Sequence, residues 1–310
     1  MDTDKEIMTT QAGLAATEHT VPFPEPTIIP PRSKHTHTLI LLHGRGGAGR
    51  EFGAEIITTN LSAPSPDNTL PKRFPGLKFI FPSAKTSHSA QWDIYLPQWF
   101  DRGPIGSAAK EHNDLLYAGL RESTRYLRTI IDSEVELVGA SNVVIGGLSQ
   151  GCAQMLHVLL SYADDEHGTL GGLVGMSGWL PFQEQVAGFI QHSQAKQEGG
   201  NEEAKPDKGL QRSAVLGAIN YVRESVLDFP PVTAEAAEAA LSTPIWLAHG
   251  GMDRTVKPEL GETAAQTFER LGWDVTWMLY EELEHWFAPF ELEDMAIFLN
   301  TRVEIPETSQ

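Results

Sequence analysis

Several features that define common protein classes are absent from this chain. It has one cysteine, Cys152, in 310 residues, so it cannot build a disulfide framework. It has no run of about 18 apolar residues that could span a bilayer. Residues 1–19 contain acids where a secretory signal has basic and then apolar residues. We therefore expect a cytoplasmic protein without stable membrane insertion.

Positive charge is also scarce. The chain has 23 Lys and Arg residues against 41 Asp and Glu residues, which gives a formal net charge of −18. Such a surface repels phosphate backbones and anionic lipids. Nucleic acid is therefore not an expected partner.

The remaining composition fits one large globular unit with short extensions. Residues 1–35 are polar and then rich in proline, a composition that does not repay the entropy of ordering, so we expect a flexible N-terminal tail. Residues 36–303 are expected to form the folded domain. Residues 304–310 are expected to be a C-terminal tail.

Short apolar runs without alternation recur along the domain, and they are typical of parallel strands covered on both faces. The runs are TLILLHG, LKFIFPS, NVVIGGLS, GGLVGMSG, PIWLAHGG and DVTWMLYEE. Helical patterns lie between most of them, at residues 109–131, 150–162, 258–271 and 289–299. This alternation predicts an α/β fold with a mostly parallel, doubly wound sheet flanked by helices, whose ligand site lies at the carboxyl ends of the strands.

One segment, at about residues 183–243, interrupts the alternation. It has no convincing strand, and it contains a helical pattern that begins near Leu210 and continues to Val226. We interpret it as an insertion on the surface, with a lid over the site as the alternative.

The first catalytic signal is Gly147-Leu148-Ser149-Gln150-Gly151, which follows the run NVVIGG and opens a helical pattern. A Gly-x-Ser-x-Gly sequence in this context predicts a sharp strand-to-helix turn that exposes a nucleophilic serine. The glycines are needed because strand and helix approach closely there. Ser149 is therefore the candidate nucleophile.

A serine hydroxyl needs a neighbouring base and an orienting acid. Asp253 follows the run PIWLAHGG, and His285 follows DVTWMLY. The order Ser149, Asp253, His285 is the order found in α/β-hydrolases. His43 and His249 also end strands, and we expect each to be a packed imidazole that bonds to loop backbone.

The backbone N–H groups of Gln150 and Arg45 are the candidates for an oxyanion hole. We expect no role for the Arg45 side chain. The same loop contains Gly44-x-Gly46-x-x-Gly49, which formally matches a dinucleotide-binding fingerprint. A Rossmann unit needs an acid about twenty residues further on, at the end of the second strand, and LKFIFPS supplies none, so this interpretation is weaker.

These motifs together resemble the phospholipase/carboxylesterase family of α/β-hydrolases, which includes acyl-protein thioesterases. The matching segments are LLHGRGG, FPSA, PQWFDRGPIG, GGLSQGCAQML, MSGWLP and HGGMDRTV. The resemblance implies the α/β-hydrolase fold and places the family's triad on Ser149, Asp253 and His285, with Arg45 and Gln150 as oxyanion donors. It also suggests that Trp99, Trp179 and Leu180 border the acyl site. It implies no metal or organic cofactor.

The chain departs from the family pattern in two places near the site. Gly47 replaces an acid in the first loop, and Trp286 follows the histidine where the family has small residues. Trp286 is expected to narrow the part of the site that holds the leaving group.

Cys152 is expected to be buried and to take no part in catalysis.

The function expected from these residues is hydrolysis of carboxylic esters or thioesters through an acyl-enzyme intermediate. The partner would be an acyl ester or an acylated protein. The alternative is a catalytically silent binding or scaffold protein built on a hydrolase fold. The preference between thioester and oxygen ester, and the oligomeric state, are left open.

Overall fold

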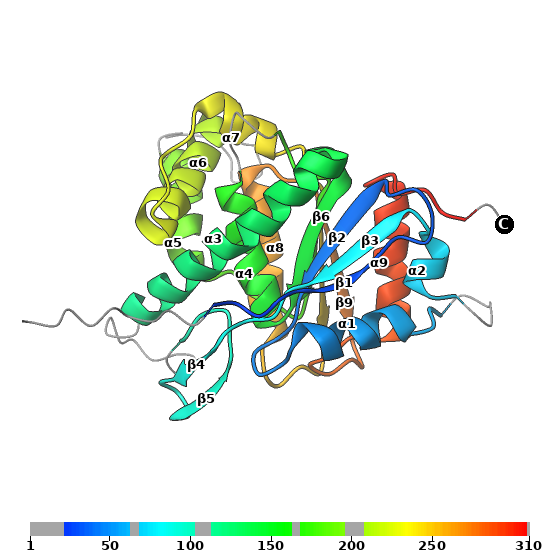
Figure 1. Cartoon of the computed structure of the whole chain (residues 1–310). Coiled ribbons are helices and arrows are strands. Elements are labelled where there is room, and N and C mark those ends of the chain that lie inside the picture. The colour runs from blue at the N-terminus through cyan, green and yellow to red at the C-terminus, as the bar shows by residue number, and fades with distance from the viewer. Residues whose placement is uncertain (1–21, 63–67, 103–112, 163–167, 196–207, 309–310) are drawn as a thin grey trace, which may run out of the picture.

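The computed structural model describes residues 22–62, 68–102, 113–162, 168–195 and 208–308. Its centre is a seven-stranded sheet in the order β1-β3-β2-β6-β7-β8-β9 (Figure 1). The strands are β1 (Thr27–Ile29), β2 (His37–Leu42), β3 (Leu77–Phe81), β6 (Val143–Leu148), β7 (Gly172–Met176), β8 (Ile245–Gly250) and β9 (Val275–Tyr280).

All neighbouring strands from β3 to β9 pair in parallel, and only β1 pairs antiparallel with β3. Each of the six apolar runs forms one of these parallel strands. The predicted mostly parallel sheet is therefore confirmed. The carboxyl ends of these strands lie at one edge of the sheet, where their loops can meet.

Helices cover both faces of the sheet (Figure 1). On one face are α1 (Gly49–Thr58), α2 (Leu70–Arg73) and α9 (Pro289–Thr301), which share a core with Leu39 and Leu41 of β2. On the other are α3 (Asn113–Val138), α4 (Gln150–Ser161) and α8 (Pro258–Leu271), which share a core with Ile40 and Leu42. Successive side chains of β2 thus belong alternately to the two cores, as expected for a strand that is buried on both faces.

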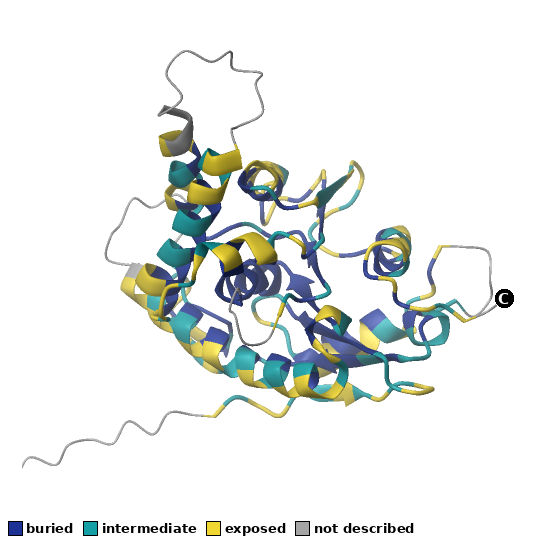
Figure 2. Cartoon of the chain, turned by 90° about the horizontal axis from the view of Figure 1, so that it is seen from above, coloured by how far each residue is buried: buried dark blue, intermediate teal, exposed yellow. Residues whose placement is uncertain are grey.

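The burial pattern shows which elements form the interior. In Figure 2 the central strands and α4 are dark blue, while the outer helices turn yellow, exposed sides to solvent. Every residue of α4 is buried. The turn that begins α4 is therefore held between the sheet and the surrounding helices.

The insertion is helical where it is described. It contains α5 (Gln183–Ala195), α6 (Lys208–Asn220), η3 (Tyr221–Leu227) and α7 (Ala234–Ala240). The prediction of a surface excursion is wrong for α6 and η3. The reason is apolar packing: Val215, Ile219, Val222 and Val226 are all 0% exposed, and η3 contacts α3 and α4.

The predicted tails also differ from the structure. Residues 1–21 lie outside the described residues, but residues 27–29 form β1 and pair with β3. At the other end, Ile305 is fully buried, and the backbone N–H of Thr308 donates to the carbonyl oxygen of Arg73 (2.9 Å). The described parts of both segments are therefore attached to the domain.

Two short strands, β4 (Thr86–Ser89) and β5 (Ile94–Pro97), form a separate antiparallel hairpin beyond the end of β3. A short 3-10 turn, η2 (Ala140–Asn142), precedes β6. Among the helices of the described ranges, none has the length and apolar character needed to cross a bilayer.

Candidate active site

Ser149 lies at the turn between β6 and α4, with φ 57° and ψ −119°. This strained conformation is typical of the turn predicted from the Gly-x-Ser-x-Gly pattern. A Cβ on Gly147 would lie 2.7 Å from the carbonyl carbon of Gly151, and one on Gly151 would lie 2.5 Å from the carbonyl oxygen of Leu42. Only glycine permits this close approach of strand and helix.

Ser149, His285 and Asp253 come together as the sequence predicts. The Nε2 atom of His285 is 2.9 Å from the Oγ atom of Ser149, and its Nδ1 atom is 2.5 Å from the Oδ2 atom of Asp253. An ionised carboxylate can only accept, so Nδ1 carries the proton and Nε2 accepts the serine O–H. The Asp253 side chain is fully buried, and that of His285 is 20% exposed.

The Asp253 carboxylate is held from several sides. Its Oδ1 atom accepts the backbone N–H groups of Thr255 (2.8 Å) and Val256 (2.9 Å). Its Oδ2 atom faces His285 and also lies 3.2 Å from the Nε2 atom of His249. The carboxylate therefore has little freedom to rotate away from His285.

His249 lies behind Asp253 and has no exposed surface. Its Nε2–H donates to the carbonyl oxygen of Val256 at 3.0 Å, which confirms the predicted contact with loop backbone. Burial lowers the pKa of His249, so the ring is neutral near pH 7.

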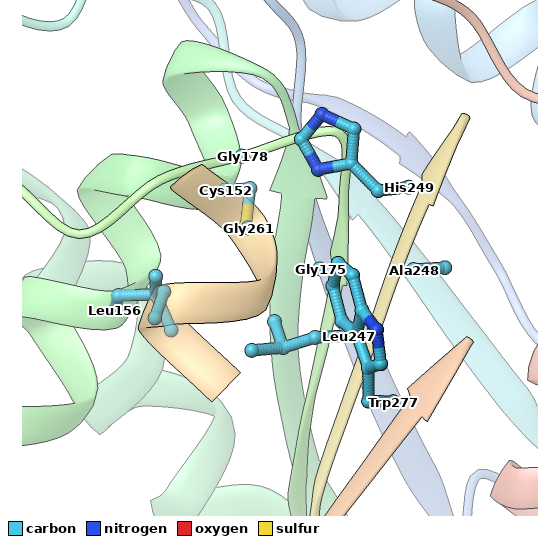
Figure 3. Close-up of a pocket in the computed structure, with 10 residues that line it drawn as sticks. Cys152, Leu156, Gly175, Gly178, Leu247, Ala248, His249, Gly261 and Trp277 are labelled. Carbon is cyan, nitrogen blue, oxygen red and sulfur yellow. The ribbon is translucent and has the colours of Figure 1, made fainter. Parts of the chain in front are cut away.

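Figure 3 shows the His249 ring above a small cavity that Cys152, Leu247 and Trp277 also line. The volume of this cavity is about 10 Å³, which leaves no room for a substrate group. Burial raises the pKa of the Cys152 thiol to about 12, and the side chain is 2% exposed. Cys152 is therefore a buried spectator, as predicted.

Gln150, the residue after Ser149, begins α4, so its backbone N–H is among the first-turn groups that have no acceptor within the helix. Its side chain is fixed: Oε1 accepts the backbone N–H of Trp99 (3.0 Å), and Nε2 donates to the carbonyl oxygen of Phe100 (2.7 Å). The segment that contains Trp99 and Phe100 is thereby attached to the nucleophile turn.

The loop after β2 also approaches Ser149 closely. A Cβ on Gly44 would lie 3.3 Å from the Cβ of Ser149. The backbone N–H of Gly46 donates to the carbonyl oxygen of Pro97 at 2.8 Å. Arg45 lies between these two glycines, so its backbone is held near the nucleophile.

The expectation that the Arg45 side chain has no role is wrong. Its guanidinium lies 4.1 Å from the ring centroid of Trp92, and the side chain is 8% exposed. Its hydrogen-bond acceptors are Gln98 Oε1 (3.0 Å), Gln91 Oε1 (2.9 Å), Ser89 Oγ (2.5 Å) and Asp101 Oδ1 (3.5 Å). These contacts join the loop to the β4–β5 hairpin, which sequence patterns did not reveal.

His43 also stiffens this loop, where Gly47 replaces the family's acid. The Nδ1–H group of His43 donates to the carbonyl oxygen of Gly44 (2.6 Å), and its Nε2 atom accepts the backbone N–H of Ala84 (3.0 Å). Burial lowers the pKa of His43 and keeps the ring neutral. The prediction of a packed imidazole is confirmed.

Packing explains the last glycine of the possible dinucleotide fingerprint. A Cβ on Gly49 would lie 2.3 Å from the carbonyl oxygen of Phe81. The Gly49 backbone N–H donates to the Oγ atom of Ser83 at 2.9 Å. The first N–H of α1 therefore already has an acceptor, which further weakens the nucleotide interpretation.

The four predicted substrate contacts have different environments. Trp99 is 1% exposed, and its indole N–H donates to the carbonyl oxygen of His43, so it supports the site from within the core. Trp179 and Leu180 line a cavity of about 330 Å³ with Phe100. Trp286 is 44% exposed and stacks on Phe287.

Sequence reasoning missed two residues of this region. His249 was recognised as a packed imidazole but not as a neighbour of Asp253, although it lies four residues earlier, at the end of the same strand. Arg102 lines the cavity beside Trp179; it lies in the segment PQWFDRGPIG that matches the family, but sequence reasoning gave it no role.

Comparison with known proteins gives a consistent result. Residues 24–197 match the model of the phospholipase/carboxylesterase family. The chain is 24% identical to acyl-protein thioesterase 1 of Gibberella zeae, over 90% of this chain and 95% of that protein. It is 27% identical to acyl-protein thioesterase 1 of Yarrowia lipolytica, over 91% of this chain and 99% of that protein.

A solved structure agrees on the fold. The crystal structure of Zea mays acyl-protein thioesterase 2 superimposes with a TM-score of 0.62 and 20% identity, over 90% of this chain and 99% of that chain. The predicted α/β-hydrolase fold is confirmed.

Proposed function

Because the chain belongs to the phospholipase/carboxylesterase family, we propose that it hydrolyses carboxylic esters or thioesters with Ser149, His285 and Asp253 as its catalytic triad. The observation that carries this proposal is the pair of contacts made by the His285 ring, 2.9 Å to Ser149 and 2.5 Å to Asp253. These contacts join a nucleophile, a base and an orienting acid.

In the first half of the reaction, the Ser149 hydroxyl attacks the acyl carbonyl carbon while Nε2 of His285 takes its proton. The Asp253 carboxylate holds Nδ1–H and stabilises the imidazolium that forms. The backbone N–H groups of Arg45 and Gln150 stabilise the oxyanion of the tetrahedral intermediate. His285 then gives its proton to the departing alcohol or thiol, which leaves an ester of Ser149.

In the second half, water takes the place of the leaving group. His285 removes a proton from the water, which attacks the acyl-serine carbonyl through the same oxyanion site. Collapse of this intermediate returns the proton to Ser149 and releases the carboxylic acid. No group outside the protein and water is needed for the proton transfers.

The names of the relatives indicate the substrate class to propose. Acyl-protein thioesterases of Gibberella zeae and Yarrowia lipolytica match nearly the whole chain, which supports an acyl ester or an acylated protein as substrate. The cytoplasmic location expected from the sequence stays a prediction.

The alternative of a silent scaffold is not favoured. Inactive members of enzyme folds retain the fold while losing the chemistry of the site. Here all three side chains are present and within hydrogen-bonding distance.

The test is the Ser149→Ala variant, which removes the nucleophile and adds no bulk. We expect kcat on a short acyl ester and on its thioester analogue to fall by about 10⁴-fold or more. Labelling of the folded protein by a fluorophosphonate should disappear, and Tm should stay near the wild-type value.

Ser133→Ala is the matched control, because the Ser133 hydroxyl donates only to the carbonyl oxygen of Thr129 on α3. It should retain both turnover and labelling. Undiminished hydrolysis by pure Ser149→Ala protein would contradict the proposed nucleophile.

A further inference from the structure

Arg102 lies at the wall of the 330 Å³ cavity described above. The cavity is open to solvent and lies between α3 and residues 179–185, and most of its lining residues are apolar. Leu116, Trp179, Leu180 and Phe182 are among them. A cavity with mostly apolar walls and a few polar or charged side chains is typical of a specific ligand site.

Among the residues that the structure describes, no carboxylate pairs with the Arg102 guanidinium. It lies 4.8 Å from the ring centroid of Trp179, and its Nε atom is buried without a hydrogen bond. Burial and the nearby charge of Arg45 lower the pKa of Arg102 to about 10, so it remains charged at pH 7. A guanidinium with no paired anion and a buried Nε atom that lacks a hydrogen bond can bind an anionic group of a ligand.

Arg45 provides a contrast within the same region. Its guanidinium has four oxygen acceptors, including the Asp101 carboxylate. The anion next to Arg102 in the sequence is therefore already used by Arg45. The one carboxylate among the described lining residues, that of Glu184, is exposed and makes no ion pair with Arg102.

The cavity adjoins the nucleophile turn. Gln150 donates to the carbonyl oxygen of Phe100, and the Phe100 ring packs edge-on against Trp179 at 6.1 Å. A Cβ on Gly178 would lie 3.5 Å from the carbonyl oxygen of Ser149. Phe100 of the cavity wall thus contacts Gln150 directly, and Gly178, which precedes Trp179 in the chain, lies against Ser149.

The position of the cavity also determines which part of a substrate, the acyl group or the leaving group, it can hold. The leaving group must lie next to His285, which protonates it. None of the described residues that line the cavity comes from the 281–288 loop that contains His285. A substrate group in this cavity therefore belongs to the acyl half.

We propose that the cavity binds an acyl group that ends in a carboxylate, which pairs with the Arg102 guanidinium. The preferred substrates would then be half-esters or half-thioesters of dicarboxylic acids. The apolar walls contact the methylene part, and the planar guanidinium suits a two-oxygen anion. This proposal rests on the proposed hydrolase function. With a net charge of −18, the protein otherwise repels such substrates, so Arg102 would decide their binding.

The test compares acyl groups of equal length that end either in a methyl group or in a carboxylate, on one leaving group. We expect wild-type kcat/KM to favour the carboxylate series. Arg102→Met should lower kcat/KM for that series by about 10- to 100-fold, mainly through KM, and should change the methyl series by less than about threefold. Arg102→Lys should retain part of the preference, since it keeps the charge but lacks the planar fork.

Arg125→Met is the matched control, because Arg125 is exposed on α3 and pairs with Asp228 at 3.1 Å. It should leave the ratio of the two series unchanged. Arg102→Met should keep Tm near the wild-type value, since no described carboxylate pairs with Arg102.

The other outcomes each overturn a different statement. Equal loss on both series would mean that Arg102 has a structural role only. Dependence on Arg102 only for esters with a neutral acyl group and a phosphate-bearing alcohol would overturn the acyl placement. If the wild-type protein hydrolysed both series with equal kcat/KM, the proposed carboxylate-binding site would be wrong, while the proposed hydrolase function would remain supported. Failure of both hydrolysis and fluorophosphonate labelling would overturn both proposals.

Discussion

At the scale of single residues, the Asp253 carboxylate is the most constrained group of the site. Two backbone N–H groups bind Oδ1, and two imidazoles face Oδ2. A carboxylate with donors on both oxygens stays in one orientation, which in turn fixes the plane of the His285 ring. We therefore interpret His249 as a positioning residue that acts on His285 through Asp253.

This interpretation predicts the effects of two substitutions at position 249. His249→Phe removes the donor that lies 3.2 Å from Asp253, so kcat should fall by about tenfold or more while KM stays near the wild-type value. His249→Gln can place an N–H group near the position of Nε2 and should recover most of kcat. Steady-state kinetics on one ester measure both values.

Melting curves of the two variants provide the control for folding. If the His249→Phe and His249→Gln variants lowered kcat equally, or if they changed only KM, the side chain at position 249 would act through packing and not through its hydrogen bond.

At the scale of elements, the site depends on how closely α4 crosses β2. Gly147 and Gly151 lie on either side of Ser149, and each meets neighbouring backbone atoms that cannot move aside. The loop after β2 is held by a second element, the β4–β5 hairpin, through the Arg45 side chain. Strand, helix and hairpin together set the position of the nucleophile and both candidate oxyanion donors.

A pair of glycine substitutions tests this close approach. Gly151→Ala puts a Cβ 2.5 Å from the carbonyl oxygen of Leu42, so it must displace the start of α4. We expect a loss of about 2 kcal/mol or more in the free energy of unfolding, together with a large loss of kcat. Urea unfolding and ester hydrolysis measure the two effects.

Gly188→Ala is the matched control on α5, because nothing lies within 4 Å of the added Cβ. Alanine is the better helix former by about 1 kcal/mol, so this variant should be as stable as wild type or slightly more stable. A Gly151→Ala protein with unchanged stability and kcat would contradict the close packing of α4 on β2.

At the scale of the whole molecule, the sheet separates two apolar cores that both end beneath the site. The core that contains α9 also holds a buried acid, Glu291, which has no exposed surface. Burial raises the pKa of Glu291 to about 8; the backbone of Ala288 opposes this shift, and the charge of Asp294 adds to it. Global stability should therefore depend on pH through this group.

The sign of the dependence follows from proton uptake. Between the ordinary pKa of about 4.5 and the raised pKa of about 8, Glu291 is ionised in the unfolded chain and protonated in the folded protein. Its contribution to stability is therefore present below the ordinary pKa and is lost as pH rises towards about 8. Glu291→Gln should raise Tm relative to wild type by several degrees more at pH 8.5 than at pH 5.

Glu259→Gln is the control for this comparison, since Glu259 is also in the first turn of a helix but is exposed. Its Tm difference from wild type should vary little with pH. Parallel Tm–pH curves for Glu291→Gln and wild type would show that the Glu291 carboxyl is not protonated in the folded protein.

The sequence by itself determined the six parallel strands and the place of the candidate triad. Short apolar runs without alternation are typical of covered parallel strands, and Gly-x-Ser-x-Gly between strand and helix predicts a sharp turn. Ser149, Asp253 and His285 each follow a strand, so local patterns were enough to place them at one edge of the sheet.

Only the tertiary structure decided what surrounds these residues. Arg45 finds its acceptors in a hairpin of short polar strands that carry no clear pattern, and the insertion joins the core through α6 and η3. Arg102 has no carboxylate partner among the described residues because the neighbouring Asp101 pairs with Arg45 instead. These features depend on distances between segments far apart in the chain, and such distances exist only after the sheet and its helices have packed.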